Sequence, residues 1–426
     1  MTSPPGDEVH PSVAAPTSML GSRSIAPDFA RGFMLVLIAV ANVPAFLWDR
    51  PTGTGAHGTG GSLADRIVQT VGITAVDSRI YPMFAFLFGY GIVQLFSRQR
   101  AAGTEPRDAR RLLRRRHWWM LAFGFVHAAL LWYGDILGGY AIVGLVLVGL
   151  FLTRSDRVIA IWAGVLLALS ASLAVLPLLG PATPQPGDGS IAAGGLDANA
   201  IPGFWAALTE RITTWAALVV PGTVLGLIVP IAVLLGMLAA RYRVLDAPAS
   251  HLPLLRRCAV GGIALGWATG LVLALQNLGT LPVSRTADWF FLPLYTLGGL
   301  FGGLGYVALF GLIAVRIERA RATPGATRGR LQGFADAVQA LGKRSLSGYL
   351  AQSVVFSPVL AAWGLGWGGY LSDWSGAVFA IAVWAATVAL AVHWERLGRR
   401  GPAEQLLRRL AYPRPVTGAP ASESTP

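Results

Sequence analysis

Ten apolar segments divide this chain, and nearly all of its basic residues fall in every second connection between them. A bilayer core of about 30 Å requires about 20 apolar residues per helix, and most of these segments are that long, although 118–133 is shorter. The pattern predicts an all-α, polytopic membrane protein with about ten transmembrane helices. The segments are residues 29–48, 79–97, 118–133, 136–153, 158–179, 215–240, 258–277, 290–315, 346–363 and 374–394.

The distribution of charge predicts which connections face the cytosol. If the N-terminus is cytoplasmic, the inner connections contain 28 of the 34 Lys and Arg residues. Short basic connections resist translocation, so this split predicts that both chain ends lie in the cytosol. A missed segment would invert every later connection and abolish the separation. The outer connections contain only Arg50, Arg66, Arg79, Arg211 and Arg285, and Arg31 lies at the inner end of the first segment.

Composition supports a single membrane domain. The chain is 54% hydrophobic and 13% charged, whereas soluble domains contain about 25% charged residues. The net charge of +13 lies at predicted membrane edges, which indicates attraction to anionic lipid headgroups and argues against nucleic acid as a partner. We expect one domain over 28–413, with disordered cytoplasmic tails at 1–27 and 414–426 that contain too little apolar surface to fold.

Two further patterns exclude specific kinds of site. The glycine-rich string over 298–305 lies inside an apolar segment with no strand before it, so it predicts close helix packing and not a nucleotide loop. Cys258 is the only cysteine, which excludes an internal disulfide. No HExxH pattern and no Cys/His pair with ligand spacing occurs, so no metal site is predicted.

Ionisable residues are rare within the apolar segments, so each of them is a candidate functional group. His127 lies deep in the segment 118–133, and Asp135 follows eight residues later. Because a spacing of eight returns to nearly the same face of a helix, both side chains are expected to reach one extracytoplasmic cavity. In the alternative interpretation, His127 only hydrogen-bonds a neighbouring helix.

Four more polar residues are expected on the extracytoplasmic side. Asn42 lies in the outer half of the first segment, and Asp77 and Arg79 lie where the second begins. Asp77 and Arg79 are candidate binding residues or, alternatively, a local ion pair. His57, in the first outer connection, is a candidate general base because imidazole titrates near pH 6.5. Since its neighbours are Gly and Thr, a loop histidine without a role is the simpler interpretation.

A second polar group is expected on the cytoplasmic side, at the start of the segment 346–363. Ser345, Tyr349 and Gln352 recur at positions i, i+4 and i+7, which places them on one face of a helix, directly after Arg344. Such a stripe either lines a substrate pathway or joins neighbouring helices by hydrogen bonds.

Several sequence pieces resemble the YeiB-like family, whose members are bacterial inner-membrane proteins classed as a domain of unknown function. The resemblance spans about 28–413 and implies a multi-pass protein of the bacterial cell membrane. The pieces are Asp28-Phe29-Ala30-Arg31-Gly32-Phe33, Asn42, Phe84-Ala85-Phe86-Leu87-Phe88-Gly89-Tyr90-Gly91, His127 with Leu131-Trp132-Tyr133-Gly134-Asp135-Ile136-Leu137, the run from Gly342 to Ser353, and Gly401-Pro402-Ala403-Glu404.

That family is grouped by similarity with transmembrane acyltransferases, which implies transfer of an acyl group from a donor such as acyl-CoA. In those proteins the first helix carries an Arg, ten residues, and then a catalytic His. Arg31 has the matching position here, but Asn42 stands where the His would be. Asn cannot carry a proton, so His127, oriented by Asp135, or His57 would have to act as the base.

Two functions are therefore expected. In the first, a cytoplasmic CoA-like donor binds its phosphates on arginines between helices, and Arg31 or Arg344 faces its path to a small-molecule or lipid-linked acceptor. In the second, the protein transports or exports a small amphipathic or lipid-linked solute, as ten helices with Gly- and Pro-interrupted segments such as 215–240 suggest. No bound cofactor is assigned in either case. The candidate phosphate-binding arginines are Arg110, Arg111, Arg114, Arg115 and Arg116.

Overall fold

Helices form almost all of the structure that the computed structural model describes, namely residues 25–179, 198–281, 288–322 and 329–412. Within these residues the only extended pairing is an isolated bridge between Thr52 and Gly58. The predicted all-α, polytopic fold is confirmed. The longer helices are α1 (Ile25–Asn42), α3 (Ile80–Ala101), α4 (Pro106–Leu130), α5 (Leu137–Leu150), α6 (Asp156–Leu179), α10 (Ile228–Arg241), α11 (Leu252–Asn277), α12 (Asp288–Ala322), α13 (Arg330–Gly342), α14 (Ser345–Leu360) and α15 (Asp373–Arg396).

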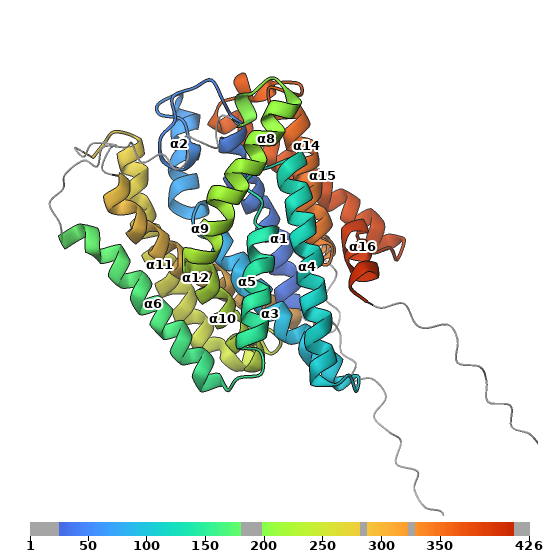
Figure 1. The fold of residues 1–426 in the computed structure, drawn as a ribbon. Helices are drawn as coiled ribbons and strands as arrows, with labels where there is room; N and C mark the ends of the chain where they lie inside the picture. Colours follow the sequence, from blue (N-terminus) through green and yellow to red (C-terminus); the bar gives the residue numbers. More distant parts are fainter. Residues whose placement is uncertain (1–24, 180–197, 282–287, 323–328, 413–426) are drawn as a thin grey trace, which may run out of the picture.

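Shorter helical pieces connect and cover these helices (Figure 1). Several of them build the ends of the bundle where the polar side chains described below lie. They are α2 (Leu63–Val71), α8 (Phe204–Thr214), α9 (Val220–Leu225), α16 (Pro402–Ala411), the 3-10 helices η1 (Val43–Phe46), η2 (Thr54–Ala56), η5 (Pro248–His251) and η7 (Trp367–Gly369), and the π-helices η3 (Gly72–Val76) and η4 (Trp215–Val219). The predicted tails, Arg285 and most of the outer connection 180–211 lie outside the described residues.

The number of membrane-spanning helices differs from the prediction. Six of the described helices are long and apolar enough to cross a bilayer, or seven if the pair Phe204–Leu225 and Ile228–Arg241, which is bent by 48°, counts as one span. The predicted count of ten is not confirmed. The three predicted segments that do not qualify are the end of α4 and two short helices, α5 with 14 residues and α14 with 16. At 1.5 Å per residue, these two helices are only about 20–24 Å long.

The surface of α6 is that of a lipid-facing helix. Only 17% of its apolar span is buried inside the protein, although its mean hydropathy is 2.4. Ile161, Trp162, Val165 and Leu169 are all exposed. A row of large apolar side chains of this kind would be unfavourable in water, so it supports a multi-pass membrane protein.

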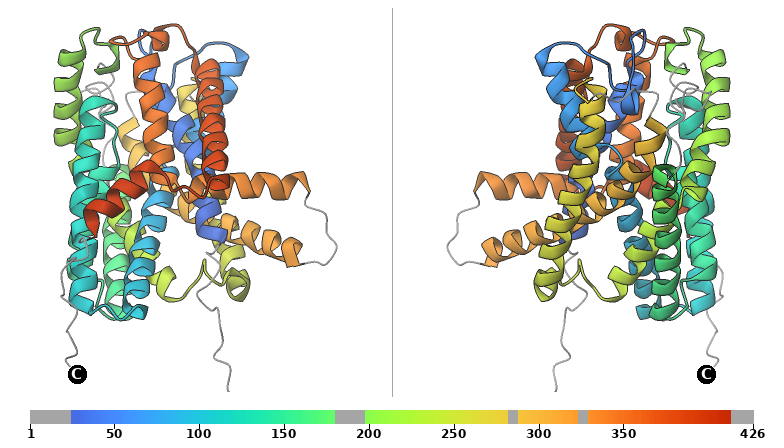
Figure 2. Two further views of the ribbon diagram at one scale, coloured as in Figure 1. Left: turned by 90° about the vertical axis from the view of Figure 1, so that its right-hand side faces the viewer. Right: turned by 90° about the vertical axis from the view of Figure 1, so that its left-hand side faces the viewer.

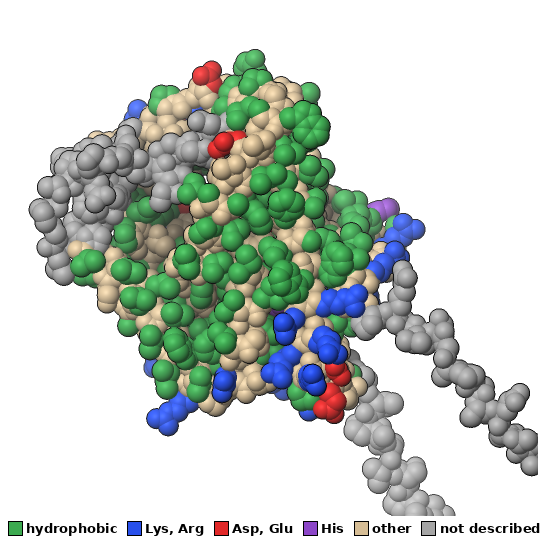
Figure 3. Space-filling view, viewed as in Figure 1, with side chains coloured by type: hydrophobic (Ala, Val, Ile, Leu, Met, Phe, Trp, Pro, Cys, Tyr) green, Lys and Arg blue, Asp and Glu red, His purple; other side chains and the backbone are tan. Residues whose placement is uncertain are grey.

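Polar contacts join connections that are predicted to lie on the same side of the membrane. At one end of the bundle, the Trp48 indole donates to the carbonyl oxygen of Leu360 at 3.0 Å. At the other end, the Gln94 side-chain amide donates to Asp246 at 2.8 Å, and a guanidinium N–H of Arg241 donates to Asp156 at 2.5 Å. In Figure 3, Lys and Arg side chains gather along the edge formed by the N-terminal half of α4 and by α16. This edge corresponds to the connections predicted to be cytoplasmic.

Glycine permits very close packing of α12 against its neighbours. A Cβ atom on Gly266 of α11 would lie 2.8 Å from the Cα of Gly302. A Cβ on Gly303 would lie only 2.5 Å from the backbone oxygen of Arg79 in α3. The glycine-rich string over 298–305 therefore packs helices together, as the sequence predicts.

These contacts predict that Gly303→Ala destabilises the protein by about 1–3 kcal/mol, because α12 and α3 must separate to admit the methyl group. The thermal midpoint of the purified protein in detergent measures the effect. Gly261→Ala, on the neighbouring helix α11, is the control, since nothing lies within 4 Å of its added atom. Equal midpoints for the two variants would contradict the packing described here.

Two helices lie across the bundle instead of along it. In Figure 2, α13 projects sideways from the upright helices and α16 runs obliquely over the opposite side. Leu407 on the buried face of α16 packs with Met120 of α4 and Ala141 of α5. The carboxylate of Glu404 accepts hydrogen bonds from the backbone N–H groups of Leu346 and Ser347 at the start of α14, at 2.8 and 3.1 Å. α16 is thereby fixed to the inner ends of α4 and α14.

Candidate functional site

His127 and Asp135 form a hydrogen-bonded pair between α4 and α5. His127 lies in the last turn of α4, and its Nδ1 is 2.9 Å from Oδ1 of Asp135. The second oxygen of Asp135 accepts the backbone N–H of Gly138 at 2.8 Å. The side chains of His127 and Asp135 are 1% and 0% exposed. The structure thus brings together the two residues that the sequence spacing connects.

The way in which they meet differs from the prediction. The spacing of eight was interpreted as two turns of one helix, but α4 ends at Leu130. The chain then turns, and Asp135 lies just before the first residue of α5, Leu137. A backbone reversal therefore places Asp135 beside His127, where the side chain also caps the start of the next helix.

The pair leaves one imidazole nitrogen available. Because the carboxylate of Asp135 accepts a hydrogen bond, it favours the tautomer of His127 that carries its proton on Nδ1. Nε2 of His127 is buried and has no hydrogen-bond partner among the described residues. An imidazole that a carboxylate orients in this way can accept a proton at the other nitrogen, which is the arrangement of a general base.

The neighbour of His127 comes from α14, and η1 packs on the turn between His127 and Asp135. The Tyr349 ring of α14 lies with its centroid 5.1 Å from that of His127. Asn42 ends α1, and four residues later the Phe46 ring stacks on Trp132 at 4.4 Å between centroids. The sequence placed His127 and Tyr349 at opposite sides of the membrane, but the structure places their rings in contact.

The other members of the cytoplasmic polar group hold helices together. The Gln352 side chain donates to the backbone oxygen of Leu35 in α1 at 3.1 Å. The Arg344 guanidinium donates hydrogen bonds to the carboxylate of Glu395 in α15 at 2.6 Å and to the backbone oxygen of Ala340 at 2.9 Å. Ser345 is the first, half-buried residue of α14. Gln352 and Arg344 therefore fit the helix-joining interpretation of the stripe.

Arg31, in the inner half of α1, reaches the middle of α3. Its guanidinium is 3.4 Å from the carboxylate of Asp28 and 3.4 Å from the backbone oxygen of Leu87. About a fifth of its side chain is exposed.

Another buried histidine, His57, lies in the first predicted outer connection. His57 is 1% exposed, with Nε2 2.8 Å from Asp77 and Nδ1 3.2 Å from Asp373. Arg50 contacts the same Asp373 carboxylate at 2.7 Å, and the Gln69 amide donates to it at 3.0 Å. His57 is therefore not a loop histidine without a role, and that simpler interpretation was wrong.

Asp373, Arg50 and Gln69 were missed in the sequence, although two of them left signals. Asp373 is an acidic residue at the start of the last apolar segment, and Arg50 is one of the few arginines in a predicted outer connection. Arginines in outer connections run against the enrichment of Lys and Arg on the cytoplasmic side, so a local interaction is expected to stabilise each of them. For Arg50 that interaction is the ion pair with Asp373.

Arg79 has a different environment from the one expected. Its side chain is 0% exposed and donates to the backbone oxygens of Ile73 at 3.1 Å and Asp77 at 2.5 Å. It also lies over the Tyr295 ring, 4.5 Å from the centroid. The Asp77 carboxylate contacts His57 instead, so among the described residues Asp77 and Arg79 do not form the local ion pair that was the alternative.

Electrostatics determine the protonation of His57. Burial alone would lower the pKa of His57, but the charge of Asp77 and the hydrogen bonds with Asp373 and Asp77 outweigh it and raise the pKa from 6.5 to about 9. At neutral pH both ring nitrogens carry protons and both are engaged by carboxylates. His57 therefore has no free nitrogen to act as a base, in contrast to His127.

This raised pKa predicts a pH-dependent stability. The protonated ring stabilises the folded state fully below its unfolded pKa of 6.5, and that stabilisation is lost as the pH rises through about 9. The shift corresponds to about 3 kcal/mol. Chemical unfolding in detergent at a series of pH values should show this loss for the wild type but not for His57→Gln. His251→Gln, at a half-buried histidine elsewhere, should retain the slope; parallel curves for wild type and His57→Gln would contradict the ion pairing.

Residues 239–414 match the family model described as "Protein of unknown function (DUF418)". The chain is 26% identical over 409 residues to "Uncharacterized protein YeiB" of Escherichia coli (strain K12), which covers 91% of this chain and 96% of that protein. It is 27% identical over 352 residues to "Uncharacterized protein YxaH" of Bacillus subtilis (strain 168), covering 79% and 80%. The predicted resemblance to the YeiB-like family is confirmed. The alignment with YeiB includes far more of the chain than the family model, which begins after His57 and His127.

Proposed function

We propose that this YeiB-like protein is a membrane-embedded acyltransferase in which His127 is the general base. The observation that carries the proposal is the free, buried Nε2 of His127 opposite the Nδ1 that Asp135 holds. Of the two histidines that were candidates to replace the base absent at Asn42, only His127 has such a nitrogen. The protein would act in the bacterial cell (inner) membrane.

The chemistry requires one proton to move twice. An acceptor hydroxyl or amine gives its proton to Nε2 of His127 while its oxygen or nitrogen bonds to the acyl carbon of a thioester such as acyl-CoA. The carbon–sulfur bond then breaks, and the thiolate takes the proton back from the imidazolium. Asp135 stabilises the imidazolium between these steps, because its carboxylate is 2.9 Å from Nδ1.

The route to the base is short on the predicted cytoplasmic side. Tyr349, which contacts the His127 ring, lies only two residues after Ser347. The Ser347 hydroxyl donates to Glu404 of α16, which lies with the basic edge of the protein. A donor that enters from the cytosol therefore has about one helical turn to cross along α14 before it reaches the base.

The proposal predicts that His127→Ala abolishes acyl transfer while the protein stays folded. Purified protein in proteoliposomes would be supplied with radiolabelled acetyl-CoA, and both thioester hydrolysis and label transfer to lipid or added acceptors would be measured. Loss of a general base typically costs about 10²–10⁴-fold in rate. Asp135→Asn should reduce the rate as well, because the ring loses its orienting charge.

His57→Gln is the matched control at another buried histidine, since it should retain transfer at a pH where the variant is folded. Full activity in His127→Ala would contradict the assignment of the base. A wild-type protein that neither binds nor hydrolyses any acyl-CoA would remove the acyltransferase proposal itself.

Solute transport remains the second candidate, and one observation favours it. The helix pair of α8–α9 and α10 is bent by 48°, and Leu227 at the break has a left-handed backbone with φ of 62°. Broken helices of this kind form binding sites in many transporters. Solute flux in proteoliposomes that persists without any acyl donor would support transport, and flux that requires a donor would contradict it.

A further inference from the structure

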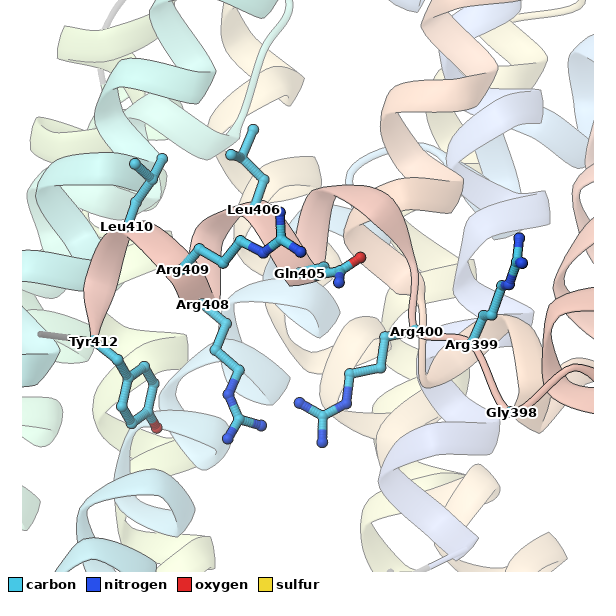
Figure 4. Close-up of a pocket in the computed structure, with 9 residues that line it drawn as sticks. All are labelled: Gly398, Arg399, Arg400, Gln405, Leu406, Arg408, Arg409, Leu410 and Tyr412. Atoms are coloured by element: carbon cyan, nitrogen blue, oxygen red, sulfur yellow. The ribbon is translucent and has the colours of Figure 1, made fainter. Parts of the chain in front are cut away.

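A cleft lies on the predicted cytoplasmic side between α16 and the connection that precedes it. It has a volume of about 1200 Å³, and four arginines line it: Arg399, Arg400, Arg408 and Arg409. In Figure 4, the guanidinium groups of Arg400 and Arg408 extend into the same space, next to Tyr412. The guanidinium of Arg408 lies 5.4 Å from the centroid of the Tyr412 ring.

Positive charge predominates among the described residues of this cleft, because none of those that line it is acidic. The carboxylates on and just before α16 bind elsewhere: Glu404 binds the start of α14, and Glu395 pairs with Lys343 and Arg344. Converging guanidinium groups repel one another, so an anion between them would be stabilised.

Basic charge continues from the cleft toward the interior of the bundle. Arg116 of α4 lies close to Tyr412, which lines the cleft, and close enough to Arg31 of α1 and Glu404 of α16 for their charges to interact. Of the five arginines in 110–116 that the sequence suggested for phosphate binding, Arg116 is thus connected to the cleft. The principal arginines, however, come from α16 and the preceding connection and not from α4.

The geometry favours phosphate as the anion. A guanidinium presents a planar fork of N–H donors that matches two oxygens of a phosphate group, and several such groups together match a diphosphate or phosphodiester. Pockets for small ligands typically measure about 300–1,000 Å³, so this cleft can hold a ligand much larger than inorganic phosphate. Leu406 and Leu410 supply apolar lining for the rest of such a molecule.

We propose that this cleft is a binding site for a phosphate-bearing ligand, in which Arg400 and Arg408 contact the phosphate groups. The ligand is either a soluble organic diphosphate or the headgroup of an anionic lipid, which share this chemistry. The inference depends on the charges and shape of the cleft and does not depend on the acyl-transfer reaction.

Two binding measurements separate these sources. In detergent without lipid, isothermal titration calorimetry with adenosine diphosphate tests the soluble ligand. In nanodiscs that contain phosphatidylcholine with or without phosphatidylglycerol, native mass spectrometry after extraction tests retention of the anionic lipid. We expect one of the two to bind and to bind more weakly as the salt concentration rises.

The double variant Arg400→Gln and Arg408→Gln should weaken that binding by at least about tenfold, because charge-assisted hydrogen bonds are lost. Its matched control, Arg107→Gln with Arg330→Gln, removes the same charge from exposed arginines outside the cleft and should bind like wild type. The proposal is overturned if neither probe binds, or if both double variants weaken binding equally. The His127→Ala variant should bind the phosphate-bearing ligand like wild type. Failure of the transferase proposal can therefore be distinguished from failure of this one.

Discussion

The carboxylate of Asp373 joins more of the chain than any other single group at its end of the bundle. It pairs with Arg50 and His57 and accepts hydrogen bonds from Gln69 and the backbone N–H of Gly58. The start of α15 is thereby tied to the first outer connection and to α2. Because a charge within apolar surroundings is costly unless it is paired, these partners must assemble together. The arrangement of the outer ends of the helices follows from that requirement.

Two of the three buried histidines, His57 and His127, show how their surroundings give one residue type two roles. His57 has a carboxylate at each ring nitrogen, so its proton is held and its function is to maintain the structure. His127 has a carboxylate at one nitrogen only, and the other remains available. Both are equally inaccessible to solvent, so burial alone does not distinguish them. The number of acidic partners decides which one can exchange a proton.

Apolar length and charge distribution predicted the helical membrane fold and the existence of polar ends, because both follow from the cost of placing charge in lipid. The pairing of His127 with Asp135 was also predicted, although through the wrong backbone path. The contacts of His57 could not be predicted, since Asp373 lies 316 residues further along the chain. Local spacing carries no information on such pairs. The count of ten spans was not confirmed because α5 and α14 are shorter than a typical crossing, and their lengths depend on packing.

The short helix α14 has a consequence for the electrical properties of the membrane. α16 and its arginines are attached at the inner end of a helix of only 16 residues, which is shorter than the roughly 20 residues that cross a bilayer core. If water fills the remaining depth, the insulating layer is thinner at this point, and the voltage across the membrane falls over a smaller distance. At a membrane potential of 100 mV, moving one elementary charge across the layer changes its free energy by about 2.3 kcal/mol. An anionic molecule at the inner end of α14 would therefore experience a steep local field.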